Sequence, residues 1–194
     1  ERISLPQSIF DMRNPDVSDD GRFVAYERFD NSGSNITHIL VKDRNSPTLL
    51  PIIVDVSSAG VVSDGNSTNP VISGDGRYVA FESNGTNLVT GDTNGVTDIF
   101  LHDLQTGTTV RLSESAAGVQ SDGGSSNATI NFDGRYVAFD SAASNLITGD
   151  TNGFSDVFRV DTQPSAITRV SVNSARLRRM GLLSNRVSPQ MGMR

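Results

Sequence analysis

The stretch Asp75–Phe81, which reads DGRYVAF, decides the fold because it returns unchanged as Asp133–Phe139. The two copies lie 58 residues apart, and the same spacing relates further pairs of identical residues, namely Asp98 and Asp156, Asp103 and Asp161, and Arg111 and Arg169. An earlier, divergent copy occupies Asn14–Arg28 and reads NPDVSDDGRFVAYER. Similarity at a fixed period indicates a repeat architecture, in which each copy is one structural unit.

Each unit divides into four short apolar runs separated by turn residues, which is the pattern of β-strands. In the second copy we expect these strands at Pro70–Ser73, Arg77–Glu82, Asp98–Asp103 and Thr108–Leu112. The Asp-Gly pair between the first two strands is a hairpin signal, because glycine tolerates the positive φ that such turns need. The second strand is apolar on both faces and therefore requires a neighbouring sheet on each side, with Ala80 and Ala138 allowing close approach.

Four strands in a unit of this length are typical of a β-propeller, in which four-stranded sheets called blades stand around a central channel. A β-sandwich is the alternative, but a sandwich does not need near-identical units. The pattern P-x-[VI]-S-x-D-G-R-x-[VI]-A-F, followed by D-[IV]-[FY]-x-x-D-x-x-T-G-x-T-x-R-[LV]-S, resembles the TolB-type (WD-repeat-like) propeller repeat of bacteria over most of Asn14–Val172. The resemblance implies a propeller of six or more blades, often exported and often a protein-binding platform.

The repeat predicts an all-β chain that holds an incomplete β-propeller of about three four-stranded blades plus one strand. The start, ERISLP, resembles the segments that end later units, so we expect residues 1–13 to form the last strand of a preceding blade and a linker. The blades themselves are expected at residues 14–58 (divergent), 59–115 and 116–173. Three blades do not close a ring of six or more and would leave two exposed edges, so we expect the sequence to be part of a longer protein whose remaining blades are its partners.

Residues 174–194 break every pattern of the repeat. The segment from Ala175 contains five of the 16 basic residues of the chain and none of the 22 acidic ones. One interpretation is a basic helix that binds a membrane or a partner. The interpretation we favour is a reading-frame error in the gene. Read two bases later, the Met-Gly junctions at Met180 and Met191 must encode glycine, where the repeat expects glycines 58 residues after Gly123 and Gly134.

The composition argues against several classes of function. The formal net charge of −6 disfavours a nucleic-acid surface, which needs clustered Lys and Arg. No run of about 18 apolar residues is present, so no membrane-spanning helix is expected. The chain has no cysteine, which excludes disulfides and thiolate chemistry. The G-x-S-x-G, G-x-G-x-x-G and P-loop motifs are also missing.

No motif predicts a catalytic, cofactor-binding or metal-binding residue. His38 and His102 stand isolated in the sequence, and His102 is expected on the surface of a strand. Arg22, Arg77 and Arg135 follow the turn glycine in every copy, and a repeated arginine favours an ion pair between blades over a ligand site.

The segment TGDTNG leaves one question open, because it occurs twice, at Thr90–Gly95 and Thr148–Gly153. With the aspartate that follows, it places side-chain oxygens at two sets of positions: Asp92, Asn94 and Asp98, and Asp150, Asn152 and Asp156. Ca²⁺ takes six to eight oxygen ligands, often carboxylates around a Gly turn, so these loops are candidate calcium sites. The alternative is turn chemistry that needs no cofactor. The first unit lacks the segment and should lack any such site.

Three functions remain open at this stage. The first is a non-catalytic scaffold or protein-binding module of an exported bacterial protein, located in the periplasm or outside the cell. The alternative is an accessory propeller domain of a larger hydrolase or peptidase whose catalytic domain lies elsewhere in the chain. A propeller enzyme with its own site in the channel is a third reading. A fold hosts many functions, so this step rests on the family resemblance.

Overall fold

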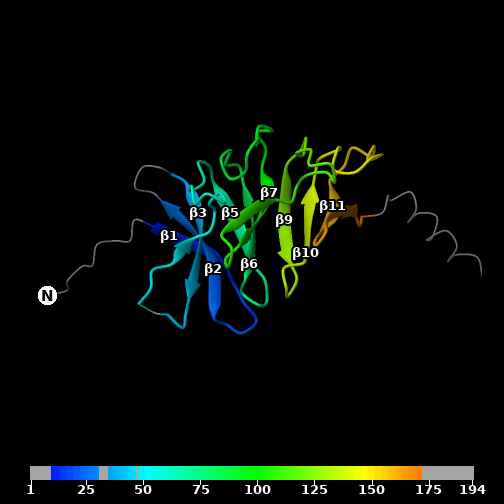
Figure 1. Ribbon diagram of the computed structural model, residues 1–194. Coiled ribbons are helices and arrows are strands. Elements are labelled where there is room, and N and C mark those ends of the chain that lie inside the picture. Colours follow the sequence, from blue (N-terminus) through cyan, green and yellow to red (C-terminus); the bar gives the residue numbers. More distant parts are fainter. Residues whose placement is uncertain (1–9, 31–34, 47, 172–194) are drawn as a thin grey trace, which may run out of the picture.

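The computed structural model describes residues 10–30, 35–46 and 48–171, and these contain twelve strands and no helix. The strands form three antiparallel sheets of four, in the orders β1-β2-β3-β4, β5-β6-β7-β8 and β9-β10-β11-β12. Their bounds are β1 Phe10–Val17, β2 Phe23–Asp30, β3 Thr37–Asp43, β4 Ile52–Ile53, β5 Ser67–Ile72, β6 Tyr78–Ser83, β7 Asp98–Asp103, β8 Thr108–Arg111, β9 Ser125–Ile130, β10 Tyr136–Ser141, β11 Asp156–Thr162 and β12 Ser165–Arg169. Figure 1 shows the sheets following one another in sequence order, which is the arrangement of propeller blades.

The all-β expectation is confirmed, and the strands of the second unit fall within a few residues of their expected bounds. One difference concerns the start of the first sheet. Strand β1 begins at Phe10, so the expected boundary between residues 13 and 14 falls inside a strand. The expected strand in residues 1–9 and the segment 174–194 lie outside the described residues. No helix that could cross a membrane occurs among the residues described.

The expected Asp-Gly turns join the first two strands of every sheet. Their glycines, Gly21, Gly76 and Gly134, have φ values of 69°, 74° and 71°, in the left-handed region. Gly95 and Gly153 in the two TGDTNG segments do the same at 69° and 68°. Glycine adopts this conformation without a steric penalty, whereas residues with a Cβ do not, so the turns depend on these glycines.

The middle sheet is buried on both faces, as its apolar second strand predicted. Val79 and Phe81 of β6 pack against the first sheet, in one cluster with Ala25 and Ile39. Ala80, between them in the strand, packs on the third sheet, in a second cluster with Val137 and Phe139. Alternate residues of one strand therefore enter two different cores, and each core is shared by two sheets.

A polar contact crosses each of these interfaces. The Glu27 carboxylate on β2 accepts the backbone N–H of Asn69 on β5 at 2.7 Å. The equivalent Glu82 on β6 accepts the backbone N–H of Asn127 on β9 at 2.8 Å. Asn69 and Asn127 have φ values of 50° and 57°, and each lies where the register of its strand shifts. The shift takes the amide out of its own ladder, so the N–H points to the preceding sheet.

An aromatic side chain of the first sheet and one of the second also pack on the turn glycine of the sheet that follows. A Cβ added to Gly76 would lie 2.4 Å from the ring of Phe23, and one added to Gly134 would lie 2.2 Å from Tyr78. The arginine before each ring lies over it, at 4.6 Å for Arg22 and Phe23 and at 4.8 Å for Arg77 and Tyr78. Glycine is therefore required at these turns for two reasons: its left-handed backbone conformation, and the space that the missing Cβ leaves for the aromatic ring.

These two requirements can be separated by experiment. Gly134→Ala and Gly153→Ala both place a Cβ on a left-handed residue, but nothing lies within 4 Å of the Cβ at Gly153. We expect Gly134→Ala to lower the free energy of unfolding by about 1–3 kcal/mol more than Gly153→Ala, because only the former forces an interface apart. Urea unfolding followed by circular dichroism measures both. Equal losses would contradict the packing role.

Candidate functional site

An apolar depression lies between the first and second sheets, at the end where the β5–β6 turn projects. It encloses about 400 Å³. Its apolar walls come from β2, β3, β4, the segment between β3 and β4, and the residue after β7, and they consist of Phe23, Val41, Leu49, Leu50, Ile52 and Leu104. Leu50 is 86% exposed and Leu49 is 64% exposed. Large apolar side chains gathered around a hollow are typical of binding surfaces.

Charged residues line the rest of this depression, and each is already held by a neighbour. Asp43 pairs with Arg22 at 2.9 Å, and Arg77 pairs with Asp103 at 2.7 Å. Asp75 accepts hydrogen bonds from the Ser73 hydroxyl and from the Arg77 backbone N–H. The depression therefore has an apolar floor and a rim of fixed charges, which favours an apolar side chain as its occupant.

The arginines after the turn glycines make their ion pairs inside one sheet, so the expectation of pairs between blades was wrong. Arg77 follows the β5–β6 turn, and Asp103 ends β7 opposite the neighbouring Tyr78. Arg135 meets Asp161 at 2.9 Å in the third sheet in the same way. The physical reason is register: in an antiparallel sheet the start of the second strand lies beside the end of the third.

Hydrogen bonds from the Arg77 guanidinium lower the pKa of Asp103 from 3.8 to about 2. A carboxyl whose pKa is lowered by folding stabilises the fold above its unfolded pKa and loses that contribution as the pH falls towards its folded pKa. Asp103 therefore contributes stability above about pH 4, and this contribution disappears between about pH 4 and pH 2.

Replacing Arg77 tests this linkage. In Arg77→Met we expect the pKa of Asp103 to rise from about 2 towards 3.8, and we expect the variant to be less stable than the native chain at neutral pH. At pH 2 the two proteins should converge. NMR titration of the Asp103 carboxyl gives the pKa, and Arg135→Met is the control because it should move the pKa of Asp161 instead. An unchanged Asp103 titration in Arg77→Met would contradict the assignment.

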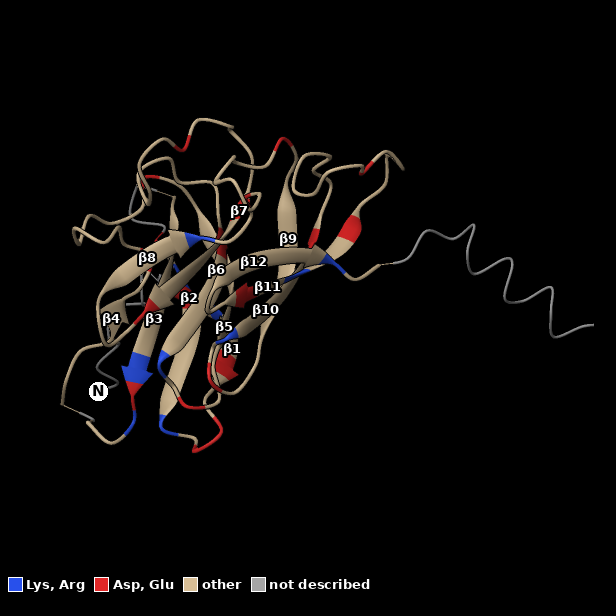
Figure 2. Ribbon diagram, turned by 45° about the vertical axis from the view of Figure 1, so that its right-hand side comes forward, with Lys and Arg blue, Asp and Glu red and all other residues tan. Residues whose placement is uncertain are grey.

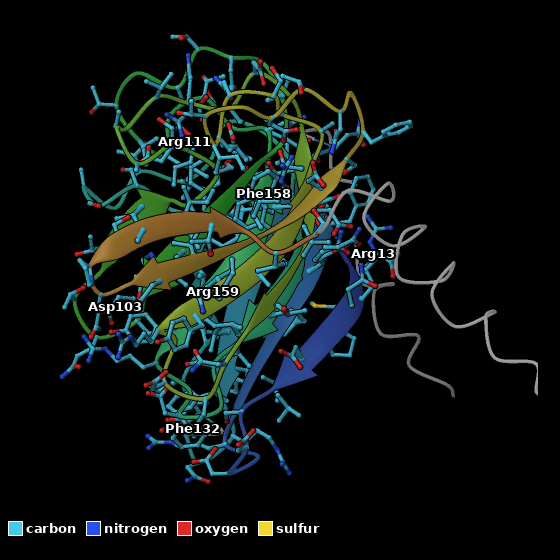
Figure 3. The ribbon with its side chains drawn as sticks, turned by 90° about the vertical axis from the view of Figure 1, so that its right-hand side faces the viewer. Arg13, Asp103, Arg111, Phe132, Phe158 and Arg159 are labelled. Atoms are coloured by element: carbon cyan, nitrogen blue, oxygen red, sulfur yellow. The ribbon has the colours of Figure 1, made fainter. Side chains whose placement is uncertain are left out.

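The TGDTNG loop of the second sheet gathers two carboxylates around an arginine. Nη1 of Arg111, on β8, lies 3.3 Å from Asp92 and 3.9 Å from Asp98. Asn94 donates to Asp98 at 2.9 Å. Burial, together with the nearby charge of Asp98, raises the pKa of Asp92 in spite of the arginine. Figure 3 shows Arg111 at the loop end of the sheets, opposite the turn that carries Phe132.

The third sheet repeats the arrangement with closer contacts. Nη1 of Arg169 lies 2.7 Å from Asp150 and 3.0 Å from Asp156, and Asn152 donates to Asp156 at 2.6 Å. Burial alone would raise the pKa of Asp156, but hydrogen bonds from Ser171, Asn152 and Arg169 together lower it. The sequence could have indicated this cluster, because Arg111 and Arg169 recur at the same spacing as the loops.

The arginine in each cluster affects whether the loop can bind Ca²⁺. A guanidinium already supplies positive charge between the two carboxylates that would have to bind the ion, and Ca²⁺ beside it would meet a like charge. Among the described residues, no group of three or more His, Cys, Asp or Glu side chains is placed to hold a metal. The residues therefore fit turn chemistry better than a calcium site.

We expect the melting temperature to stay unchanged when millimolar Ca²⁺ or a chelator is added, because Arg111 and Arg169 already place a cation beside the carboxylates of the loops. Differential scanning calorimetry measures this. Arg111→Met is the informative variant, since it leaves Asp92 and Asp98 without their cation and should lower stability by about 3–5 kcal/mol. A rise in the melting temperature of the native chain with Ca²⁺ would overturn the argument.

The loop of the second sheet also holds the segment that leads into the third sheet. Thr93 donates its backbone N–H to Gln120 at 3.1 Å, and Gln120 donates back to the Thr93 hydroxyl at 2.8 Å. Asn94 donates to the carbonyl of Ser121 at 3.1 Å. In the second sheet the loop thus binds the connection to the next sheet, which sequence reasoning did not foresee.

The two histidines have partners that the sequence did not reveal. Nδ1 of His38 lies 2.8 Å from Asp55, whose other oxygen accepts the backbone N–H of Ile39 at 3.0 Å. His102 was expected on the surface, but it is 5% exposed and lies 2.8 Å from the hydroxyl of Thr109. Burial lowers the pKa of His102. His102 is buried because its sheet lies between the other two, so both faces of that sheet are covered.

Comparison with known proteins identifies the fold. The β-propeller domain of the Trilobed protease from Pyrococcus furiosus superimposes with a TM-score of 0.55 at 17% identity, over 83% of this chain and 42% of that one. TolB from Acinetobacter baumannii gives 0.51 at 18% identity, over 84% and 33%. An acylaminoacyl peptidase gives 0.50 at 16% identity, over 80% and 24%. No family model and no curated protein matches the sequence.

These likenesses define the fold. The chain has a TolB-like β-propeller fold, and its three sheets form an incomplete propeller. It spans less than half the length of each of these proteins.

Proposed function

We propose that this chain is part of a non-catalytic propeller of the TolB-type repeat family that binds other proteins in the periplasm or outside a bacterial cell. The observation that carries the proposal is the apolar depression between the first two sheets, with Leu49 and Leu50 exposed at its mouth. An exposed apolar hollow suits a partner's side chain better than it suits a reaction, because the charged groups beside it are all engaged in pairs or turns.

The charge distribution supports a protein partner over a nucleic acid. Figure 2 shows acidic residues in the loops at both ends of the sheets. With 22 acidic and 16 basic residues the chain repels polyanions on balance. A partner segment that combines an apolar side chain with basic neighbours would match both the depression and this field.

A peptide selection tests the proposal directly. We expect a random peptide library displayed on phage to yield peptides that share a large apolar residue and bind the purified chain. Leu50→Glu should weaken the binding of such a peptide by about tenfold or more, because a seated apolar side chain is worth about 1.5–3 kcal/mol. Titration calorimetry with the synthetic peptide measures the change.

Val119→Glu is the matched control, because Val119 is also exposed but lies in the connection between the second and third sheets. It should leave binding unchanged. Failure to select any peptide, or equal binding by Leu50→Glu and the native chain, would argue against the depression as a binding site.

An accessory propeller of a peptidase is the second candidate. It is favoured by the likeness to the propeller domain of the Trilobed protease, although that likeness concerns the fold. A hydrolase domain with a G-x-S-x-G motif in the same open reading frame would support it. Sequencing the gene on both sides of the repeats decides between the two candidates.

A further inference from the structure

A buried histidine lies in the contact between the first two sheets. His102 stands opposite Val79 where β6 pairs with β7, and Val79 packs on the first sheet. Residues that stand opposite one another in an antiparallel pair share a face, so His102 is on the side of the second sheet that meets the first. The side chain is almost fully buried there. A titratable group is thus enclosed between two sheets.

Hydrogen bonds join His102 to the connection between these two sheets. Nδ1 of His102 lies 2.8 Å from the hydroxyl of Thr109 on β8, and that hydroxyl donates to the carbonyl of Val56. Val56 and Ser58 belong to the connection between β4 and β5. The Ser58 hydroxyl accepts the backbone N–H of Thr109 at 3.0 Å and donates to the Thr109 carbonyl at 3.2 Å. His102 and Thr109 therefore hold the connection from the first sheet against the second.

These bonds fix which nitrogen of His102 carries the proton. A carbonyl oxygen can only accept, so the single proton of the Thr109 hydroxyl goes to Val56, and the hydroxyl must accept from His102. The neutral ring therefore has its proton on Nδ1 and its lone pair on Nε2. No described residue forms a hydrogen bond with Nε2. A second proton would enter at Nε2, where it would add a charge without finding an acceptor among the described residues.

The third sheet has apolar residues at the same three positions. They are Val160, Ile167 and Ala116, which stand 58 residues after His102, Thr109 and Ser58. Val160 pairs with Ile167 as His102 pairs with Thr109. Val160 is buried in the core between the second and third sheets, and Ile167 packs against that core. The architecture therefore accepts an apolar set here, and the three polar residues are not needed to build a blade.

The carboxylates that act on His102 are already bound to other groups. They are Asp103, next to it on β7, and Asp55, in the connection from the first sheet. Asp103 accepts two hydrogen bonds from the Arg77 guanidinium, and Asp55 lies 2.8 Å from Nδ1 of His38. Burial lowers the pKa of His102, and the charges of Asp103 and Asp55 raise it by less. The folded chain therefore favours the neutral ring.

We propose that His102 makes the contact between the first two sheets sensitive to acid. The neutral ring holds the connection at Val56 through Thr109. Protonation replaces it with a buried charge that has no free carboxylate beside it, so the first sheet is held less firmly. This contact is separate from the depression lined by Leu50, so the effect of acid does not depend on peptide binding there.

The direction of the pH dependence follows from proton binding. Folding lowers the pKa of His102, so the folded chain binds this proton less tightly than the unfolded chain does. The contribution of His102 to stability is complete above its unfolded pKa of 6.5 and declines as the pH falls below that value. For one such group the unfolding constant rises by at most about tenfold for each pH unit.

A variant that carries the residues of the third sheet tests the proposal. It combines Ser58→Ala, His102→Val and Thr109→Ile. Urea unfolding of the native chain and of this variant is compared at about pH 7 and about pH 5. We expect the unfolding constant of the native chain to rise about tenfold more than that of the variant. His38 and the carboxylates titrate in both proteins, so the difference belongs to His102. An equal rise in both would overturn the proposal.

Two measurements on the native chain need no variant. NMR titration of the His102 ring should give a midpoint below 6.5, and a midpoint at or above that value would count against the proposal. Hydrogen exchange, corrected for its intrinsic pH dependence, locates the effect. The Asn69 N–H reports on the first interface and the Asn127 N–H on the second, since Glu27 and Glu82 accept them. We expect acid to reduce the protection of Asn69 and to spare Asn127. Equal losses, or none, would contradict the assignment.

Discussion

The stacking of the three sheets depends on one contact, a buried carboxylate that accepts a backbone N–H from the neighbouring sheet. Glu27 is 1% exposed, and it would be costly to bury without partners. It receives Arg13, the Asn14 side chain and the Asn69 N–H, all within 2.9 Å. The last of these donors exists only when the next sheet is in place, so the carboxylate ties the geometry of one sheet to the position of another.

This contact explains why the repeat contains an asparagine where a strand would favour a β-branched residue. The N–H can point away from its own sheet only where the ladder is interrupted, and in this protein a left-handed asparagine stands at each interruption. Asparagine tolerates that conformation better than other residues with a side chain, apart from aspartate. The apolar cores on either side fix how closely the sheets approach, while the carboxylate and the asparagine fix their register.

Much of the fold could be predicted from the sequence, because the repeated segments show where each unit begins and which residues recur in it. The unit length, the four strands and the glycine turns follow from DGRYVAF and its copies, and burial of β6 on both faces follows from its unbroken apolar run. The sequence could not show whether the ion-pair partner of Arg77 lies in its own sheet or in the next. A recurring residue has the same spacing in both cases. Burial of His102 was missed for a related reason. The sequence of one unit does not show that both faces of its third strand, β7, are covered when the unit stands between two others.

The first sheet, which lacks the TGDTNG loop, shows which residues accompany that loop in the other two sheets. His38 occupies the position of Asp98, and Asp55 occupies that of Ser113, since each accepts the N–H of the equivalent isoleucine, Ile39 or Ile99. Ile53 occupies the position of Arg111, because the next residue in each case, Val54 or Leu112, donates to that same isoleucine. The sheet that lacks the loop thus lacks its arginine and its strand-entry aspartate together, and a histidine–aspartate pair replaces them. In the second sheet Arg111 lies between Asp92 and Asp98 of the loop, and the neighbouring Thr93 holds the connection to the next sheet through Gln120.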